Sequence, residues 1–130
     1  MIAVILASGR LDRLYTGLSL LVSAAAEGEA AQGLATFEAL APLLDEELEA
    51  RALRPEETPA LSDAGRATFA RTLAELRDTA GELPGCRIWA CAAAAETTGI
   101  GRQEIEARLD GVLSTSRFLR EAGDARLVVV

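Results

Sequence analysis

An uninterrupted apolar run at residues 2–7 is the feature that most constrains the fold of this 130-residue chain. A strand without polar alternation is buried on both faces, which is typical of parallel sheets covered by helices. Leucine and valine then recur at helical spacing from Leu14 to Val22, and Gly28 is a suitable helix stop. A second short strand is expected at residues 33–37. Strand, helix and strand in this order predict a right-handed βαβ unit.

The rest of the sequence continues to alternate between strand and helix patterns. The further elements expected are a helix at 43–53, a loop at 54–61, a helix capped by Ser62 and ended by Gly81, a strand at 86–91, helices at 92–98 and 101–109, a short strand at 111–113, a helix at 114–122 and a strand at 125–130. This alternation predicts an α/β protein, a three-layer α/β/α sandwich with a mostly parallel five-stranded sheet. The length predicts a single domain over residues 1–130.

The composition excludes several kinds of active site. The chain has no histidine and no lysine, so all 13 basic residues are arginine. This rules out a Ser-His-Asp triad, an imidazole metal site, a Schiff base and the lysine of a P-loop, and we expect neither a metal nor a cofactor. A net charge of −7 without a basic patch argues against binding of nucleic acid or of an anionic membrane.

No segment of the sequence predicts export or membrane insertion. The charge-free run at residues 14–26 is too short to span a bilayer. Residues 1–7 lack the basic start of a signal peptide, and we interpret them as part of a strand. We therefore expect a cytoplasmic protein in which both cysteines are free thiols.

Residues 38–61 form an acidic insertion after the second expected strand. Between positions 38 and 57 there are seven acidic residues and two arginines, so this segment has a net charge of −5. The simplest interpretation is a solvated helix followed by a connector. The alternative is a lid or a docking surface, because long connections in small domains are often functional. A docking surface of this charge would suit a partner protein with a basic face.

The carboxyl ends of parallel strands meet at one edge of the sheet, where open α/β sheets bind ligands. The residues expected at this edge are Ser8, Gly9 and Arg10 after the first strand, Phe37 and Glu38 after the second, and Cys91 at the end of the third. Among them Cys91 is the natural nucleophile. It directly precedes the helix expected at 92–98, whose free backbone N–H groups would stabilise a thiolate. A buried structural cysteine is the alternative.

The second cysteine, Cys86, lies on the same expected strand as Cys91. An extended strand would separate the two by roughly 16 Å. A disulfide requires Cα atoms within about 7 Å, so we expect no bond between these cysteines in one chain. We interpret Cys86 as structural.

Residues 91–100, Cys-Ala-Ala-Ala-Ala-Glu-Thr-Thr-Gly-Ile, resemble the signature of the DsrE/DsrF-like family. In that family a strand ends in a cysteine, a small-residue helical turn follows, and a Gly-Ile or Gly-Val pair comes after it. The likeness extends over most of the chain and implies a sulfur-relay role, in which Cys91 accepts sulfane sulfur as a persulfide and passes it to a partner protein. Arg10 and Arg102 are the expected cationic supports of that anion. The family also implies a homo-oligomer, a trimer or a hexamer.

The residues leave other functions open. A non-catalytic oligomeric subunit or scaffold would keep the fold with Cys91 inert. A thiol peroxidase is disfavoured because Ile88 stands where peroxiredoxins place a threonine before the reactive cysteine. Flavin or nucleotide binding is disfavoured because residues 8–10 lack a phosphate-binding loop. Association is also indicated by the apolar strand at 127–130, which would need a cover at a sheet edge.

Overall fold

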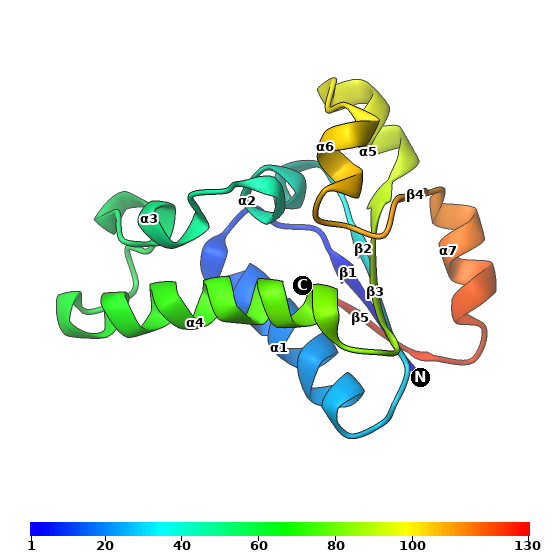
Figure 1. The fold of residues 1–130 in the computed structure, drawn as a ribbon, viewed down its shortest axis with the longest axis horizontal. Helices are drawn as coiled ribbons and strands as arrows, with labels where there is room; N and C mark the ends of the chain where they lie inside the picture. The colour runs from blue at the N-terminus through cyan, green and yellow to red at the C-terminus, as the bar shows by residue number, and fades with distance from the viewer.

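The apolar run at the N-terminus forms an inner strand of a five-stranded sheet in the computed structural model, which describes residues 1–130 (Figure 1). The strands are β1 (Ile2–Leu6), β2 (Ala31–Ala35), β3 (Cys86–Cys91), β4 (Val112–Leu113) and β5 (Arg126–Val129). Their order is β4-β3-β2-β1-β5, and every neighbouring pair is parallel. The expected α/β class is therefore confirmed, with a sheet that is wholly parallel.

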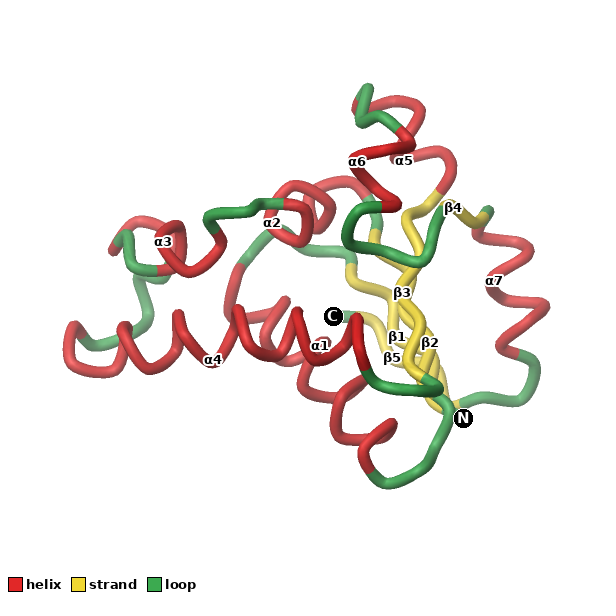
Figure 2. The backbone as a smooth tube through the Cα atoms, in the orientation of Figure 1, coloured by secondary structure: helices red, strands yellow, loops and turns green.

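The helices lie on both faces of this sheet, as Figure 1 and Figure 2 show. They are α1 (Leu11–Ala26), α2 (Leu40–Leu44), α3 (Leu48–Ala52), α4 (Asp63–Glu82), α5 (Ala92–Thr98), α6 (Arg102–Glu106) and α7 (Thr115–Ala122), with 3-10 turns η1 (Phe37–Ala39) and η2 (Pro55–Glu57). None of these helices combines the length and apolar character needed to cross a membrane. Helices α1 and α4 cover one face and α7 the other, which makes a three-layer α/β/α sandwich.

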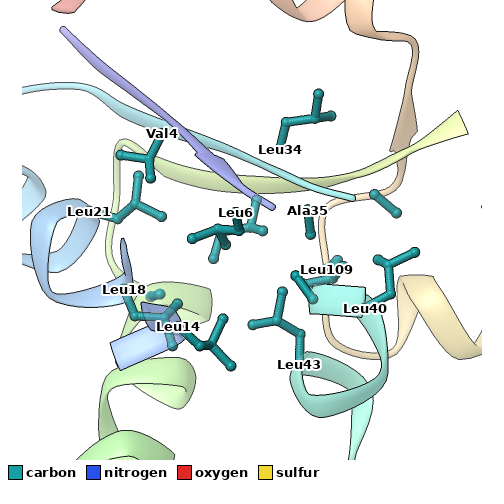
Figure 3. Packing of buried hydrophobic residues seen from close by; sticks show 14 of the residues in the cluster. Val4, Leu6, Leu14, Leu18, Leu21, Leu34, Ala35, Leu40, Leu43 and Leu109 are labelled. Atoms are coloured by element: carbon teal, nitrogen blue, oxygen red, sulfur yellow. The ribbon is translucent and has the colours of Figure 1, made fainter. Parts of the chain in front are cut away.

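The core lies mainly between the sheet and α1. Its buried side chains include Val4, Leu6, Leu14, Leu18 and Leu21 (Figure 3). Gly17 lies within this leucine stripe, where a Cβ atom would overlap Leu6 Cδ2 and Val130 Cγ2. Helix α1 therefore approaches β1 more closely than any residue other than glycine would allow at this position.

Strand β2 begins and ends two residues earlier than the sequence predicts. Parallel pairing aligns Ile2 with Ala31 and Leu6 with Ala35, so β2 ends level with β1. The chain then leaves the sheet through η1, where Phe37 has a φ of 33°, a value uncommon outside glycine. Phe37 therefore follows the strand instead of belonging to it.

The helix expected at 43–53 is replaced by two short helices, α2 and α3. Asp45 has extended backbone angles, and its Oδ1 accepts a hydrogen bond from Glu47 N at 2.8 Å. Side-chain bonds of this kind to nearby backbone groups compete with helix propagation. The acidic residues that break the helix also turn the chain, so α3 extends away from the sheet (Figure 1).

Two buried arginines of α4 hold the acidic insertion in place. Arg66 donates to Thr58 Oγ1 at 2.9 Å, to Thr58 O at 3.3 Å and to Leu61 O at 2.9 Å. Arg77 donates to two backbone carbonyl groups at the end of α2. Residues 38–61 are therefore packed against α4 through specific hydrogen bonds.

We expect Gly17→Ala to lower the free energy of unfolding by about 1 kcal/mol, because the added methyl group overlaps Leu6 and Val130. This steric cost outweighs the helix propensity of alanine. Gly81→Ala in α4 is the matched control: its Cβ would meet no atom within 4 Å, and it should raise that free energy by about 0.5–1 kcal/mol. Urea unfolding followed by circular dichroism measures both variants. A stabilised Gly17→Ala would contradict the close approach of α1.

Candidate functional site

The carboxyl ends of β1 and β2 bring two of the expected segments together. Gly9 lies against the backbone of η1, where a Cβ atom at position 9 would be 2.8 Å from Glu38 O. Ser8 Oγ accepts a hydrogen bond from Arg10 N at 3.1 Å, which fixes the turn of this loop. Arg10 then forms an ion pair with Asp12 at 2.8 Å. Glycine at position 9 thus allows the loop between β1 and α1 to contact η1 directly.

A cavity of about 580 Å³ lies beside this contact. We call it the acid-lined cavity, and its walls include Gly9, Arg10, Asp12, Glu38, Arg51 and residues 56–61. Three residues of the expected site, Gly9, Arg10 and Glu38, therefore share one cavity. Cys91 does not line it.

Cys91 is the last residue of β3 and the N-cap residue of α5. Its Sγ lies 3.7 Å from Thr115 Oγ1, the hydroxyl of the first residue of α7.

Leu109, which follows α6, lies beside Leu43 on the face that α1 covers, whereas α7 covers the other face (Figure 3, Figure 1). The connections after β3 and β4 thus leave the sheet on opposite sides. Such a divergence marks the position where open α/β sheets bind ligands.

The cysteine is enclosed at this position. Cys91 is only 4% exposed, and it lines none of the cavities. Its neighbour Ala92 lines a smaller cavity of about 330 Å³, together with Arg102 and Val112. A group bound in that cavity would lie next to the start of α5.

The expected site residues do not form one cluster. Arg10 lines the acid-lined cavity and Arg102 lines the smaller one, and neither forms a hydrogen bond with Cys91. Phe37 is 52% exposed, on a turn that lies against α5. The turn η1 therefore stands between the acid-lined cavity and the segment that follows Cys91.

Cys86 lies at the opposite end of β3. Both cysteines are free and buried. Burial, with a smaller contribution from the Asp110 carboxylate, raises the pKa of Cys86 to about 11. A thiol with this pKa stays protonated at neutral pH, which suits a structural cysteine.

Sequence reasoning missed Thr115, and it named residues 56–61 only as part of a possible lid or docking surface at 38–61. A signal for Thr115 was present, because it follows the strand expected at 111–113, whose carboxyl end must lie at the same edge as Cys91. No signal indicated that residues 56–61 would line a cavity beside Gly9. Their place beside Gly9 depends on hydrogen bonds from Arg66, which only the folded chain brings together.

No protein-family model matches this sequence, and no curated protein matches it. The likeness to DsrE/DsrF-like proteins thus stays a resemblance, which rests on residues 91–100 and on the order of the motifs along most of the chain. No three His, Cys, Asp or Glu side chains are grouped so that they could hold a metal ion.

Because the pKa of Cys86 is raised to about 11, we expect iodoacetamide to alkylate Cys91 before Cys86 in the native protein at neutral pH. Labelling of Cys86 should increase only as the pH approaches that pKa. In urea the two cysteines should react at similar rates, since the burial that protects Cys86 is lost. Limited labelling followed by peptide mapping measures the ratio. Faster labelling of Cys86 than of Cys91 in the native protein would show that Cys86 is the reactive thiol and Cys91 the structural cysteine.

Proposed function

We propose that this protein is a sulfur-relay protein or sulfurtransferase that carries a persulfide on Cys91. The observation that best supports this role is the position of Cys91 between the first residues of two helices. It is the N-cap residue of α5, and its Sγ lies 3.7 Å from the Thr115 hydroxyl at the start of α7. Hydroxyl and backbone N–H groups are suitable donors to an anionic sulfur. The resemblance of residues 91–100 points to the same role.

The proposed step is the transfer of one sulfane sulfur atom. The Cys91 thiolate attacks the outer sulfur of a donor persulfide, a new S–S bond forms at Cys91, and the S–S bond of the donor breaks. The donor leaves as a thiolate, so no oxidant or reductant is consumed. The Thr115 hydroxyl would then donate a hydrogen bond to the sulfur of the product. Transfer to an acceptor thiol is the same step in reverse.

The burial of Cys91 has two consequences for this proposal. An enclosed persulfide is protected from thiols in solution, which a carrier in a reducing cytoplasm requires. Thr115 is exposed, so a donor would reach Cys91 from the start of α7. The same burial is the observation that favours the second candidate, a non-catalytic oligomeric subunit in which Cys91 is inert.

The proposal includes a partner protein that donates sulfur to Cys91 or accepts sulfur from it. Glu46, Glu47 and Glu49 are exposed, but they lie around the start of α3, at the end of the molecule opposite α7 (Figure 1). A partner with a basic face that docked only on these acids would not cover Cys91. We therefore place the partner at the side of α5 and α7, in a cytoplasmic setting.

A persulfide or polysulfide donor should add the mass of one sulfur atom to the native protein, and dithiothreitol should remove it readily only after urea has exposed Cys91. Cys86→Ser should gain the same mass, and Cys91→Ser should not. Thr115→Val should slow the reaction about tenfold, because a hydrogen bond to a charged sulfur is lost, whereas Thr115→Ser should react at nearly the native rate. Intact mass spectrometry over time measures all four variants. Absence of the added sulfur in native protein would favour the inert subunit.

The exposed edge strand supports a homo-oligomer, for which the family resemblance implies a trimer or a hexamer. Leu127 and Val129 lie on the same face of β5 and are 51% and 63% exposed. Apolar side chains at an open sheet edge favour association. Light scattering should therefore give a multiple of the 13.7 kDa chain mass, and Leu127→Arg with Val129→Arg should reduce it. A monomer mass for the native chain at micromolar concentration would refute this assembly.

A further inference from the structure

We propose that the acid-lined cavity binds a small organic cation, an ammonium group on an apolar chain. Its volume of about 580 Å³ is within the range of roughly 300–1,000 Å³ that is typical of small-molecule sites. The cavity lies at the carboxyl ends of β1 and β2, and Cys91 is not among its walls. This inference therefore does not depend on the sulfur-relay proposal.

The walls of the cavity have an excess of negative charge. Its ionisable side chains are four carboxylates and two guanidinium groups, from Asp12, Glu38, Glu56, Glu57, Arg10 and Arg51. Four negative and two positive groups leave a formal charge of −2. This sign attracts a cation and repels a free anion.

Both arginines are already engaged by carboxylates. Arg10 pairs with Asp12 at 2.8 Å. Arg51 lies 3.3 Å from Glu57 and also pairs with Asp45 at 3.5 Å. The positive charge of each guanidinium group is therefore partly offset by a neighbouring carboxylate, which makes the cavity less suited to an anionic ligand.

Two carboxylates of the cavity have no such partner. Glu38 and Glu56 form no ion pair, and both residues are exposed. They come from two different turns, η1 and η2, and both line the cavity, so a cation bound there can be attracted by both carboxylates. An ammonium group has three donors, which suits this arrangement.

Another part of the lining is apolar and held in place. Pro59, Ala60 and Leu61 line the cavity, and Arg66 donates to the carbonyl oxygens of Thr58 and Leu61 from behind. The apolar surface can cover a hydrocarbon chain. Since the buried guanidinium group fixes this wall in the absence of a ligand, binding does not have to order it.

Butylamine is a suitable probe, with butanol and butyrate as neutral and anionic controls of similar size. In ¹⁵N-resolved NMR titrations we expect butylamine to shift the amide signals of Gly9, Glu38 and residues 56–61 in a saturable way. Butanol and butyrate should leave these signals nearly unchanged. Equal shifts with all three probes, or no shifts at these residues, would overturn the inference.

Two matched pairs of substitutions distinguish direct contact with butylamine in the cavity from the effect of the protein's net charge on its affinity. Glu38→Gln with Glu56→Gln should weaken butylamine binding at least about tenfold, because two charge-assisted contacts are lost. Glu46→Gln with Glu47→Gln changes the net charge equally but lies outside the cavity, so affinity should stay within about twofold. Equal weakening by both pairs would show non-specific attraction and refute the site. Cys91→Ser should bind butylamine like the native protein, whatever the outcome of the persulfide experiment.

Discussion

The close packing of α1 on the sheet determines the position of the acid-lined cavity at the carboxyl ends of the strands. Gly17 meets the side chain of Leu6, and at Gly33 of β2 a Cβ atom would be 3.0 Å from Leu21. Both glycines let the helix approach its two central strands closely. Because close-packed interiors resist displacement, the loop that joins β1 to α1 has little freedom to move. Its residue Gly9 is thereby held against η1, and the acid-lined cavity takes its shape from that contact.

The acidic insertion depends on a second kind of interaction. Its inner side is apolar, with Leu40, Leu43 and Leu48 buried. The buried guanidinium groups of Arg66 and Arg77 also bind carbonyl oxygens of its backbone. A buried guanidinium group needs hydrogen-bond acceptors, so these bonds favour one arrangement of the segment. The solvent-facing carboxylates are left unpaired as a result.

Much of the fold could be predicted from the sequence, because apolar runs and capping residues act locally. The strand at 86–91, the helix capped by Ser62 and the helix at 92–98 occur where their patterns predict them. The second strand was misplaced because its ends are set by pairing with β1, which no local pattern encodes.

The candidate site was only partly predictable, for a similar reason. The βα connectivity placed Cys91 and Gly9 at one edge of the sheet, as expected for parallel strands. Long arginine side chains, however, bind whatever carbonyl groups the tertiary structure brings near. The wall formed by residues 56–61 depends on such bonds, so its position appears only in the folded chain.

The separation of the two candidate regions has a chemical reason. A persulfide at Cys91 is an anion, and the carboxylates of the acid-lined cavity would repel it if they faced the sulfur directly. In the structure Cys91 faces the Thr115 hydroxyl, whereas Glu38 and Glu56 line a cavity on the other side of η1. Phe37 lies at the start of this turn in an uncommon backbone conformation, and strained residues of this kind cluster at binding sites. A cation bound to Glu38 would therefore act on Cys91 only through η1, by shifting the turn that lies against α5. Such a coupling would be mechanical rather than electrostatic, and it would require a ligand whose affinity differs between two positions of η1.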